Sequence, residues 1–527
     1  MRTLATACVC AVLCVTAVYA QPTITWQRNL GGSSGDLANS LDRTTDGGYV
    51  AVGVTNSSDF DVSGQHGVTD VWVTKVDPLG ELEWQLCLGG SGSEEGLQIR
   101  QCADAGYILV GRTSSTDGDV TATYGSTDIW VVKLTQAGEL EWQRSYGGSG
   151  SDIGYAIEEL PGGGFALLAE TGSLEAPMAD NHGARDLWLA VIGPTGELQW
   201  SKCYGGSDTE RARDLCLMPD GGYLLVGNSD SDDGDVAGNH GILPILDADA
   251  WVVRCNAEGD LLWQRCLGSS GNEIARSATI APNGKIYVKS EALSATPPDG
   301  DITDPIGETD IWIARLSQDG ELEQQRSFGG TADDLADNII SGPDNEIFVL
   351  GTTRSSDGNV TASLGGISDL WLFKLNSELD LLWQRSLGGS LEDVGKDIHW
   401  DQASGALAMV GRSNSADGDL TGNYGSYDMW LVKFNPEAVG ITQASTSTAL
   451  TLYPNPSSDQ VRIQWSDPAA QQLEVVDALG RVVYQEQLRQ QGNNERVLAV
   501  GDWANGLYTV RVLGQKAQQV SRFIKKN

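Results

Sequence analysis

A short signature, Asp-x-Trp, recurs seven times along this chain of 527 residues. Successive copies are 58, 58, 63, 61, 59 and 59 residues apart. Self-similarity at a fixed period of this size is typical of repeat architectures, in which each repeat is one unit that stacks on its neighbours. The copies are Asp70/Trp72, Asp128/Trp130, Asp186/Trp188, Asp249/Trp251, Asp310/Trp312, Asp369/Trp371 and Asp428/Trp430. We therefore expect a repeat fold rather than one large core.

A second tryptophan register predicts that the repeats close into a ring. It begins before the first Asp-x-Trp and ends before the last, through Trp26, Trp84, Trp142, Trp200, Trp263, Gln324 and Trp383. The seventh copy stops after the segment Met429–Phe434, one strand short of the others. A lone segment of matching sequence, Thr23–Leu30, precedes the first copy. We expect this N-terminal segment to supply the missing strand.

The second copy shows what one repeat contains. Its segments Gly96–Cys102, Tyr107–Thr113, Asp128–Leu134 and Leu140–Tyr146 are apolar, β-branched or alternating, as strands are. Four antiparallel strands repeated seven times describe a β-propeller, whose blades bury both faces on their neighbours. The predicted fold is therefore all-β, with a seven-bladed propeller over residues 21–435.

Two structural roles follow for the repeated residues. The tryptophans of both registers are expected in the core between blades. Each Asp-x-Trp aspartate stands just before a strand, where its carboxylate can accept backbone N–H groups. Strict strand alternation places the long Gly-, Ser- and Asp-rich loops on one face, which is where function is expected.

Charge excludes some classes of partner. The formal net charge is -37, residues 450–527 hold nine Lys/Arg and seven Asp/Glu, and Arg2 is the only charged residue before Gln21. Residues 21–449 therefore carry -40. Such a surface repels nucleic acid and anionic lipid, and it attracts cations or basic partners. Solubility in a salty or divalent-rich environment is the simpler interpretation.

The N-terminus predicts export. Residues 1–20 combine Arg2, a short apolar run and small residues before the polar Gln21, which is typical of a secretory signal peptide cleaved after Ala20. No later segment is long and apolar enough to predict a membrane span.

Six cysteines follow the signal peptide, and an even number in an exported chain permits disulfides. Cys87–Cys102 and Cys203–Cys216 are the pairings to test first. The alternative is a small side chain tolerated in a strand, because Cys87, Cys203 and Cys266 share one repeat position that holds Asn or Ser in the other copies.

The repeat motifs resemble those of known exported proteins. The succession W-Q-R-x-L-G-G-S, D-G-G-Y-x-x-x-G, S-S-D-G-D-V and D-x-W-x-x-K over residues 23–435 resembles a repeat of exported bacterial β-propeller proteins. The segment Lys133–Gln143 is distantly similar to the tryptophan-docking repeat of quinoprotein dehydrogenases. Those proteins have eight blades and a Thr-Gly turn, from which this chain departs, so no quinone cofactor is assigned.

The C-terminal segment resembles a sorting domain. Residues 436–449 are rich in small residues and read as a linker. Residues 450–527 contain Y-P-N-P, D-A-L-G-R-V-V and N-G-L-Y-T-V-R-V and end on a basic Lys525-Lys526 pair. These pieces resemble the C-terminal sorting domain of type IX secretion cargo in the Bacteroidota. The resemblance implies a small Ig-like β-sandwich, recognition by the type IX secretion machinery, passage through the periplasm, and release or display at the outer-membrane surface.

Acidic motifs in the loop between the second and third strands are candidate calcium ligands. Alternating oxygen ligands around a glycine suit a hard cation such as Ca²⁺. The motifs comprise Asp59/Asp61, Asp117/Asp119, Asp233/Asp235, Asp299/Asp301, Asp357/Asn359 and Asp417/Asp419, and the third copy lacks one. The complete EF-hand pattern is absent. The alternative interpretation is an Asx-turn that closes the loop through side-chain to backbone hydrogen bonds.

No catalytic motif stands out. His66, His182 and His240 share a loop position that holds Tyr124, Leu364 or Tyr424 in other copies, which favours packing over catalysis or metal ligation. No phosphate loop, H-E-x-x-H motif or Ser/His/Asp order appears. Abundant acidic pairs single out no carboxylate dyad.

The sequence therefore favours a binding or adhesion module with an unknown protein or glycan ligand. Near-identical copies favour this function over an enzyme, since catalysis requires asymmetry. The alternative is an extracellular enzyme, glycan-active or other, that uses the loop-rich face. If one site is specific, we expect it at the deviating loops Leu174–Asp180, Ile242–Asp247 and Ser294–Asp304.

Overall fold

The computed structural model describes residues 22–241, 248–293, 298–361, 363–402 and 404–435, and then 451–453, 457–465, 470–476, 481–488, 494–514 and 518–526. The chain divides into two compact units, of which the first spans residues 21–438 and the second holds the C-terminal strands. The predicted signal peptide (1–20), the linker (436–449) and the loop Ile242–Asp247 lie outside the described residues.

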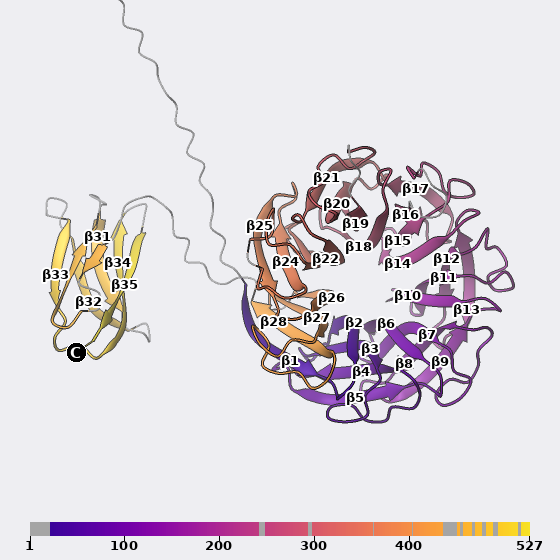
Figure 1. Ribbon diagram of the computed structural model, residues 1–527, viewed down its shortest axis with the longest axis horizontal. Coiled ribbons are helices and arrows are strands. Elements are labelled where there is room, and N and C mark those ends of the chain that lie inside the picture. The colour runs from indigo at the N-terminus through magenta and orange to yellow at the C-terminus, as the bar shows by residue number, and fades with distance from the viewer. Residues whose placement is uncertain are drawn as a thin grey trace, which may run out of the picture. The chain divides into compact units, whose positions relative to one another are not determined.

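Seven four-stranded antiparallel sheets form the first unit and stand as blades around an axis (Figure 1). From the axis outward the strands of the first three blades are β2 (Asp36–Arg43), β3 (Tyr49–Thr55), β4 (Asp70–Val76) and β5 (Leu82–Leu88); β6 (Glu94–Gln101), β7 (Tyr107–Thr113), β8 (Asp128–Leu134) and β9 (Leu140–Tyr146); and β10 (Asp152–Glu159), β11 (Phe165–Thr171), β12 (Asp186–Ile192) and β13 (Leu198–Tyr204).

The next four blades repeat this order. They comprise β14 (Glu210–Leu217), β15 (Tyr223–Ser229), β16 (Asp249–Cys255) and β17 (Leu261–Leu267); β18 (Glu273–Ile280), β19 (Ile286–Leu293), β20 (Thr309–Leu316) and β21 (Leu322–Phe328); β22 (Asp334–Ser341), β23 (Ile347–Thr353), β24 (Asp369–Leu375) and β25 (Leu381–Leu387); and β26 (Asp393–Asp401), β27 (Ala406–Ser413), β28 (Asp428–Asn435) and β1 (Thr23–Leu30). The seven-bladed propeller predicted from the repeat is confirmed.

The N-terminal strand closes the ring, as the offset of the tryptophan registers predicts. Strand β1 pairs antiparallel with β28, from Thr23 opposite Asn435 to Leu30 opposite Met429. The Gln27 amide oxygen accepts a hydrogen bond of 2.9 Å from the indole N–H of Trp430. The first strand of the chain is thus the outer strand of the last blade.

The Asp-x-Trp tryptophans lie in the core between blades, as expected. All seven are at most 1% exposed. In the first blade the Trp72 indole donates to Gln85 Oε1 at 2.9 Å, and the same bond recurs in every blade except the third. There Ser201 replaces the glutamine, and the Trp188 indole N–H has no partner among the described residues. The repeated Trp and Gln therefore join the third strand of a blade to its outer strand.

Each apolar cluster is shared by two neighbouring blades. Ala51 and Trp72 of the first blade pack with Val410 and Leu431 of the seventh, so the cluster spans the point of closure. In the first blade the two middle strands, β3 and β4, are almost wholly buried, whereas the outer strand β5 is half-exposed. The hydrophobic effect therefore acts mainly between blades.

The proposed disulfide pairings are wrong. All six cysteines are free thiols. Cys87 packs between the seventh and first blades and Cys102 between the second and third. Cys203 packs between the second and third blades, whereas Cys216 packs between the fourth and fifth. The members of each pair occupy different interfaces, and burial raises the pKa of the Cys87 and Cys102 thiols to about 12.

The second unit is a small β-sandwich, described here by itself. One sheet holds β29 (Thr451–Tyr453), β30 (Gln460–Gln464) and β33 (Glu495–Ala499), and the other holds β32 (Val482–Gln487), β31 (Ala470–Val476), β34 (Gly506–Gly514) and β35 (Gln518–Lys525). Ile463, Leu498, Val475 and Val510 from the two sheets share one core. The Ig-like sandwich expected from the resemblance is confirmed, and β29, β33 and β35 are strands that the sequence did not predict.

Removing residues up to Leu30 tests ring closure. The truncated protein loses β1, exposes the edge of β28 and leaves the Trp430 indole without Gln27. We expect the unfolding midpoint to fall by about 10 °C or more, because several kcal/mol of burial and hydrogen bonding disappear. Thermal unfolding followed by circular dichroism measures it, with Gln27→Ala as a milder control that removes one hydrogen bond. An unchanged midpoint in the truncated protein would contradict the shared blade.

Candidate functional site

Each inner strand contains a β-bulge that turns one side chain toward the axis. In β2 the pairing with β3 shifts register between Ala38 and Ser40, so Asn39 is an extra residue, and the other six inner strands shift at the same place. We call the seven extra residues the bulge ring, which consists of Asn39, Leu97, Tyr155, Arg213, Arg276, Asp337 and Lys396. β-Bulges commonly redirect side chains next to functional sites.

Small residues let the bulged strands approach the preceding blade. Alanine or glycine precedes every bulge-ring residue. A Cβ added to Gly96 would lie 2.4 Å from Val52 Cγ2, and one added to Gly154 would lie 2.3 Å from Val110 Cγ2. The pattern Asp/Glu-x-Ala/Gly before a variable residue is the signal that sequence reasoning missed.

Residues that follow the bulge ring tie neighbouring blades together at the axis. Asp397 Oδ2 accepts the backbone N–H of Leu41 at 2.9 Å, across the point of closure. Gln98 Oε1 accepts from Ile157 N at 2.6 Å, Asp214 Oδ2 from Ala278 N at 3.0 Å and Ser277 Oγ from Ile339 N at 3.1 Å. The inner strands are sheet edges with a partner strand on one side only, so these bonds satisfy N–H groups that no strand pairs.

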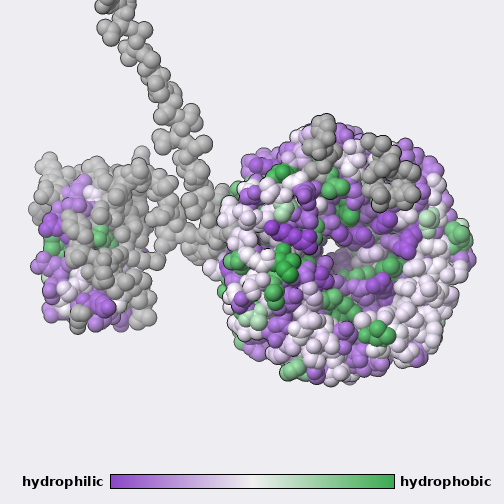
Figure 2. All heavy atoms as spheres, viewed as in Figure 1, coloured by the Kyte–Doolittle hydropathy of each residue, from purple (hydrophilic) through white to green (hydrophobic). Residues whose placement is uncertain are grey.

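The bulge ring lines an axial cavity of about 540 Å³. Figure 2 shows hydrophilic side chains around a hollow at the centre of the propeller. Three of the ring's members are cations that come from the fourth, fifth and seventh blades. Lys396 lies 3.9 Å from Asp337, and Arg276 lies 3.0 Å from Glu291. Burial raises the pKa of the Asp337 carboxyl. The cavity wall therefore differs from blade to blade.

Arg213 differs from its neighbours in the ring. Its guanidinium lies 5.2 Å from the centroid of the Tyr155 ring and donates to Ala212 O at 2.8 Å. Its Nε has no hydrogen-bond partner, and no carboxylate of the described residues lies within ion-pair distance. A cation stacked on an aromatic face and lacking a counter-ion is suited to an acidic ligand.

Charged groups continue beyond the bulge ring on both sides. A second cavity of about 310 Å³ shares Arg276 and Lys396 with the first and adds Arg354 and Arg412. Arg354 directly follows β23 and Arg412 is near the end of β27, so both lie toward the long loops. Toward the tight turns, Arg100 pairs with Glu158 at 2.9 Å. His399 Nδ1 lies 3.3 Å from Asp42. Burial lowers the pKa of His399, so its imidazole is neutral near pH 7.

The candidate calcium residues lie one pair to a blade and do not converge. The first aspartate of each motif accepts a backbone N–H from the loop that leads into its blade, as Asp117 Oδ1 does from Ser91 at 2.7 Å. Equivalent bonds of 2.7 to 2.9 Å are made by Asp59, Asp233, Asp299, Asp357 and Asp417.

The second residue of each motif faces the first glycine of the loop that leads into its blade. Asp119 Oδ2 lies 3.1 Å from Gly89 N. The equivalents Asp61, Asp235, Asp301, Asn359 and Asp419 lie 3.3 to 3.4 Å from theirs. Backbone donors 26 to 33 residues away in sequence occupy these oxygens, so the bonds join two loops and differ from the local Asx-turn that was the alternative interpretation. The described residues hold no group of three or more His, Cys, Asp or Glu side chains placed to bind a metal ion, and calcium binding stays a prediction.

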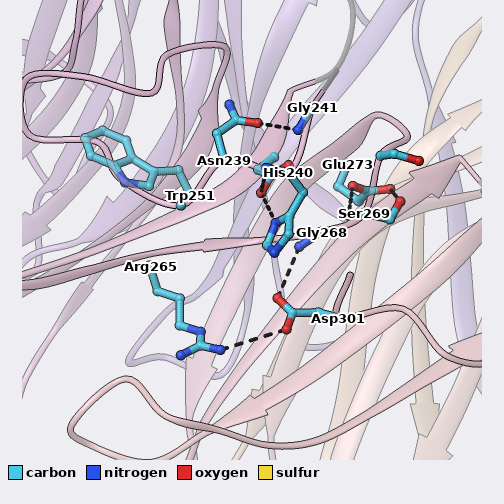
Figure 3. A network of polar contacts seen from close by, with 12 residues as sticks. Asn239, His240, Gly241, Trp251, Arg265, Gly268, Ser269, Glu273 and Asp301 are labelled. Atoms are coloured by element: carbon cyan, nitrogen blue, oxygen red, sulfur yellow. Dashed lines mark hydrogen bonds and ion pairs between the residues drawn. The ribbon is translucent and has the colours of Figure 1, made fainter. Parts of the chain in front are cut away.

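The loop histidines do more than pack, which corrects the expectation from sequence. Nδ1 of His66, His182 and His240 lies 2.9, 2.7 and 2.6 Å from Oδ2 of Asp70, Asp186 and Asp249. Figure 3 shows His240 in the fourth blade, close to the Asn239–Gly241 and Gly268–Asp301 hydrogen bonds. The Asp249 side chain raises the pKa of His240. The backbone N–H at this loop position donates to the aspartate whether the residue is histidine or tyrosine, as His66 N and Tyr124 N both do.

The Asp-x-Trp aspartates accept backbone N–H groups, as expected from their position before a strand. Asp128 Oδ2 accepts from Tyr124 N at 2.6 Å, and Asp428 Oδ2 accepts from Tyr424 N at 2.6 Å. The seven aspartates are at most 2% exposed. They fasten the end of the long loop to the third strand.

Comparisons with known proteins identify the C-terminal unit. Residues 451–526 match the secretion system C-terminal sorting domain. This domain implies contact with the type IX secretion machinery and directs the chain to the cell surface or exterior, so the protein is an exported β-propeller. No helix among the described residues is long and apolar enough to cross a membrane.

Comparisons with whole known proteins found low similarity. The regulatory protein FlaEY of Caulobacter vibrioides is 27% identical over 181 residues, which are 30% of this chain and 17% of that protein. This chain thus matches well under two thirds of its relative's length. Among solved structures, the Neurospora crassa Pan2 WD40 domain has a TM-score of 0.40 at 9% identity, covering 77% of this chain and 90% of that one. Sqt1 from Chaetomium thermophilum has a TM-score of 0.40 at 10% identity, covering 77% and 99%.

A matched-salt comparison tests calcium binding at the loops. We expect Ca²⁺ to raise the unfolding midpoint more than NaCl of equal ionic strength, because a ligand of the folded ring stabilises it by mass action whereas screening acts with either salt. Asp117→Asn with Asp119→Asn should reduce the calcium increment while an amide oxygen still accepts from Ser91. Glu175→Gln, in the blade that lacks the motif, is the matched control. Equal responses to both salts would leave these aspartates as loop fasteners.

Proposed function

We propose that this protein is an exported binding module that holds its ligand in the axial cavity. The observation that carries the proposal is the bulge ring. Alanine or glycine precedes it in every blade, and a polar residue follows it in every blade but the third, which has Ala156. The bulge ring itself holds Asn, Leu, Tyr, Arg, Asp and Lys. Sequence diversity is thus concentrated where side chains face a cavity, as expected for a ligand site.

The chemistry of the wall favours an acidic glycan. Arg213 supplies an unpaired cation above Tyr155. Arg276 and Lys396 also line the cavity, but they lie against the carboxylates of Glu291 and Asp337, so Arg213 is the candidate contact for an anionic group. The propeller as a whole is strongly acidic, and carboxylates also line the cavity, so an anionic ligand would depend on a local cation such as Arg213.

A panel of neutral, uronate-containing and sulfated polysaccharides tests the proposal. We expect the mature chain to bind at least one acidic polysaccharide and Arg213→Gln to weaken that binding about tenfold or more, since a charge-assisted contact is worth well over 1 kcal/mol. Lys202→Gln, which removes a positive charge from outer strand β13, should leave binding unchanged. No acidic binder, or equal affinity in Arg213→Gln, would contradict the proposal.

The alternative, an extracellular enzyme, is separated from a binding module by the fate of the ligand. A binding module releases the polysaccharide intact, whereas a glycan-active enzyme shortens it. The chain length of the polysaccharide after prolonged incubation with the protein decides between them.

A further inference from the structure

Two buried carboxylates meet wherever one blade passes to the next. One is the Asp-x-Trp aspartate, and the other is the acid that opens the next inner strand. The pairs are Asp428/Asp36, Asp70/Glu94, Asp128/Asp152, Asp186/Glu210, Asp249/Glu273, Asp310/Asp334 and Asp369/Asp393, and every member is at most 2% exposed. Burying two like charges side by side is costly unless one is neutralised.

The first glycine of the Gly-Gly loop lets the two carboxylates approach. A Cβ added to Gly31 would lie 2.6 Å from Asp428 Oδ1 and 2.9 Å from Asp36 Oδ2. A Cβ added to Gly147 would lie 2.2 Å from Asp128 Oδ1 and 2.9 Å from Asp152 Oδ2. The two oxygens of each pair therefore face the same small volume.

The inner-strand acid has the hydrogen bonds that an ionised carboxylate needs. Asp36 Oδ2 accepts from Gly32 N at 2.6 Å and from Ser57 Oγ at 2.8 Å, and its Oδ1 accepts from Thr55. Asp152 Oδ2 likewise accepts from Gly148 N at 2.9 Å and Ser173 Oγ at 2.7 Å. At these two junctions, three donors to the inner-strand carboxylate favour its charged form.

The Asp-x-Trp aspartate is satisfied on one oxygen only. Oδ1 of Asp128 and Oδ1 of Asp428 are buried and have no donor among the described residues. The charged groups facing Asp428 are the carboxylates of Asp36 and Asp61, and the group facing Asp128 is the carboxylate of Asp152. A buried acceptor beside another acceptor is unfavourable, but a proton converts it into a donor.

We propose that Asp128 and Asp428 each carry a proton on Oδ1 and donate it to the inner-strand carboxylate of the next blade. The folded ring then holds one added proton at each of these two junctions. At three other junctions His66, His182 and His240 stand where Tyr124 and Tyr424 stand here, and their imidazoles lie against the aspartate instead.

The sign of the pH dependence follows. Burial raises the pKa of Asp428 from 3.8 to about 6, and it also raises that of Asp128. Between the unfolded and folded pKa values the folded ring binds more protons than the unfolded chain. The free energy of unfolding therefore decreases as pH rises through this window and levels off above it. These two junctions make the ring more stable in mild acid than at neutral pH.

Asparagine mimics a protonated aspartate, which gives a direct test. In Asp428→Asn the side-chain oxygen still accepts from Tyr424 N, and the amide N–H₂ donates toward Asp36. We expect this variant to unfold about 2 °C or more above wild type near pH 8 and close to wild type near pH 5. Asp36→Asn, the matched control at the same junction, should be destabilised at both pH values, because it loses an acceptor of three hydrogen bonds.

Infrared difference spectroscopy of the wild type provides a readout that does not depend on how a variant folds. Protonated carboxylic acids absorb in a C=O stretching region separate from that of carboxylates. We expect a band there near pH 5.5, above the pKa of solvated carboxyls, and a smaller band in Asp428→Asn and Asp128→Asn. The proposal is overturned if wild type shows no such band, or if Asp428→Asn destabilises the ring near pH 8 as much as Asp36→Asn does.

Discussion

Every blade of this propeller needs a neighbour on each face, and the rest of the structure depends on that need. The middle strands are apolar on both sides, so one blade alone would expose two hydrophobic faces to water. The first and last blades become neighbours because the first strand of the chain belongs to the last blade. Because β1 pairs with β28 and Gln27 binds the Trp430 indole, the apolar clusters continue around the whole ring.

Repetition and function occupy different parts of each blade. The Trp–Gln pairs, the junction carboxylates and the loop-fastening aspartates recur because every junction solves the same packing problem. The bulge adds a residue that takes no part in packing between blades, so its side chain is free to vary. The axial cavity gathers these seven side chains at one place, and Arg213 over Tyr155 shows how different two adjacent blades become there.

Periodicity predicted the strands, the blade count and the closure, because burial of alternate residues and the Asp-x-Trp spacing follow directly from the fold. The sequence predicted less well which residues meet in the folded protein. Cys87 and Cys102 are close in sequence but belong to different interfaces, so the proposed pairing failed. His240 seemed to pack because tyrosine replaces it elsewhere, yet it binds Asp249. The bulge ring escaped notice because an extra residue interrupts the two-residue period of a strand. A specific site was expected at the deviating loops, and their described residues, Leu174–Asp180 and 298–304, do not line the axial cavity.

A cross-link across the closing pair tests the ring most directly. Thr23 and Asn435 are exposed partners at the end of the β1–β28 ladder. In the mature chain with Thr23→Cys and Asn435→Cys, a disulfide between the two introduced thiols should form on oxidation. The native thiols, five of them buried and that of Cys216 half-buried, should stay reduced. The account predicts a single unfolding transition at a higher midpoint than that of the same variant in its reduced form. Failure of the disulfide to form, or an oxidised protein no more stable than the reduced one, would contradict closure by the N-terminal strand.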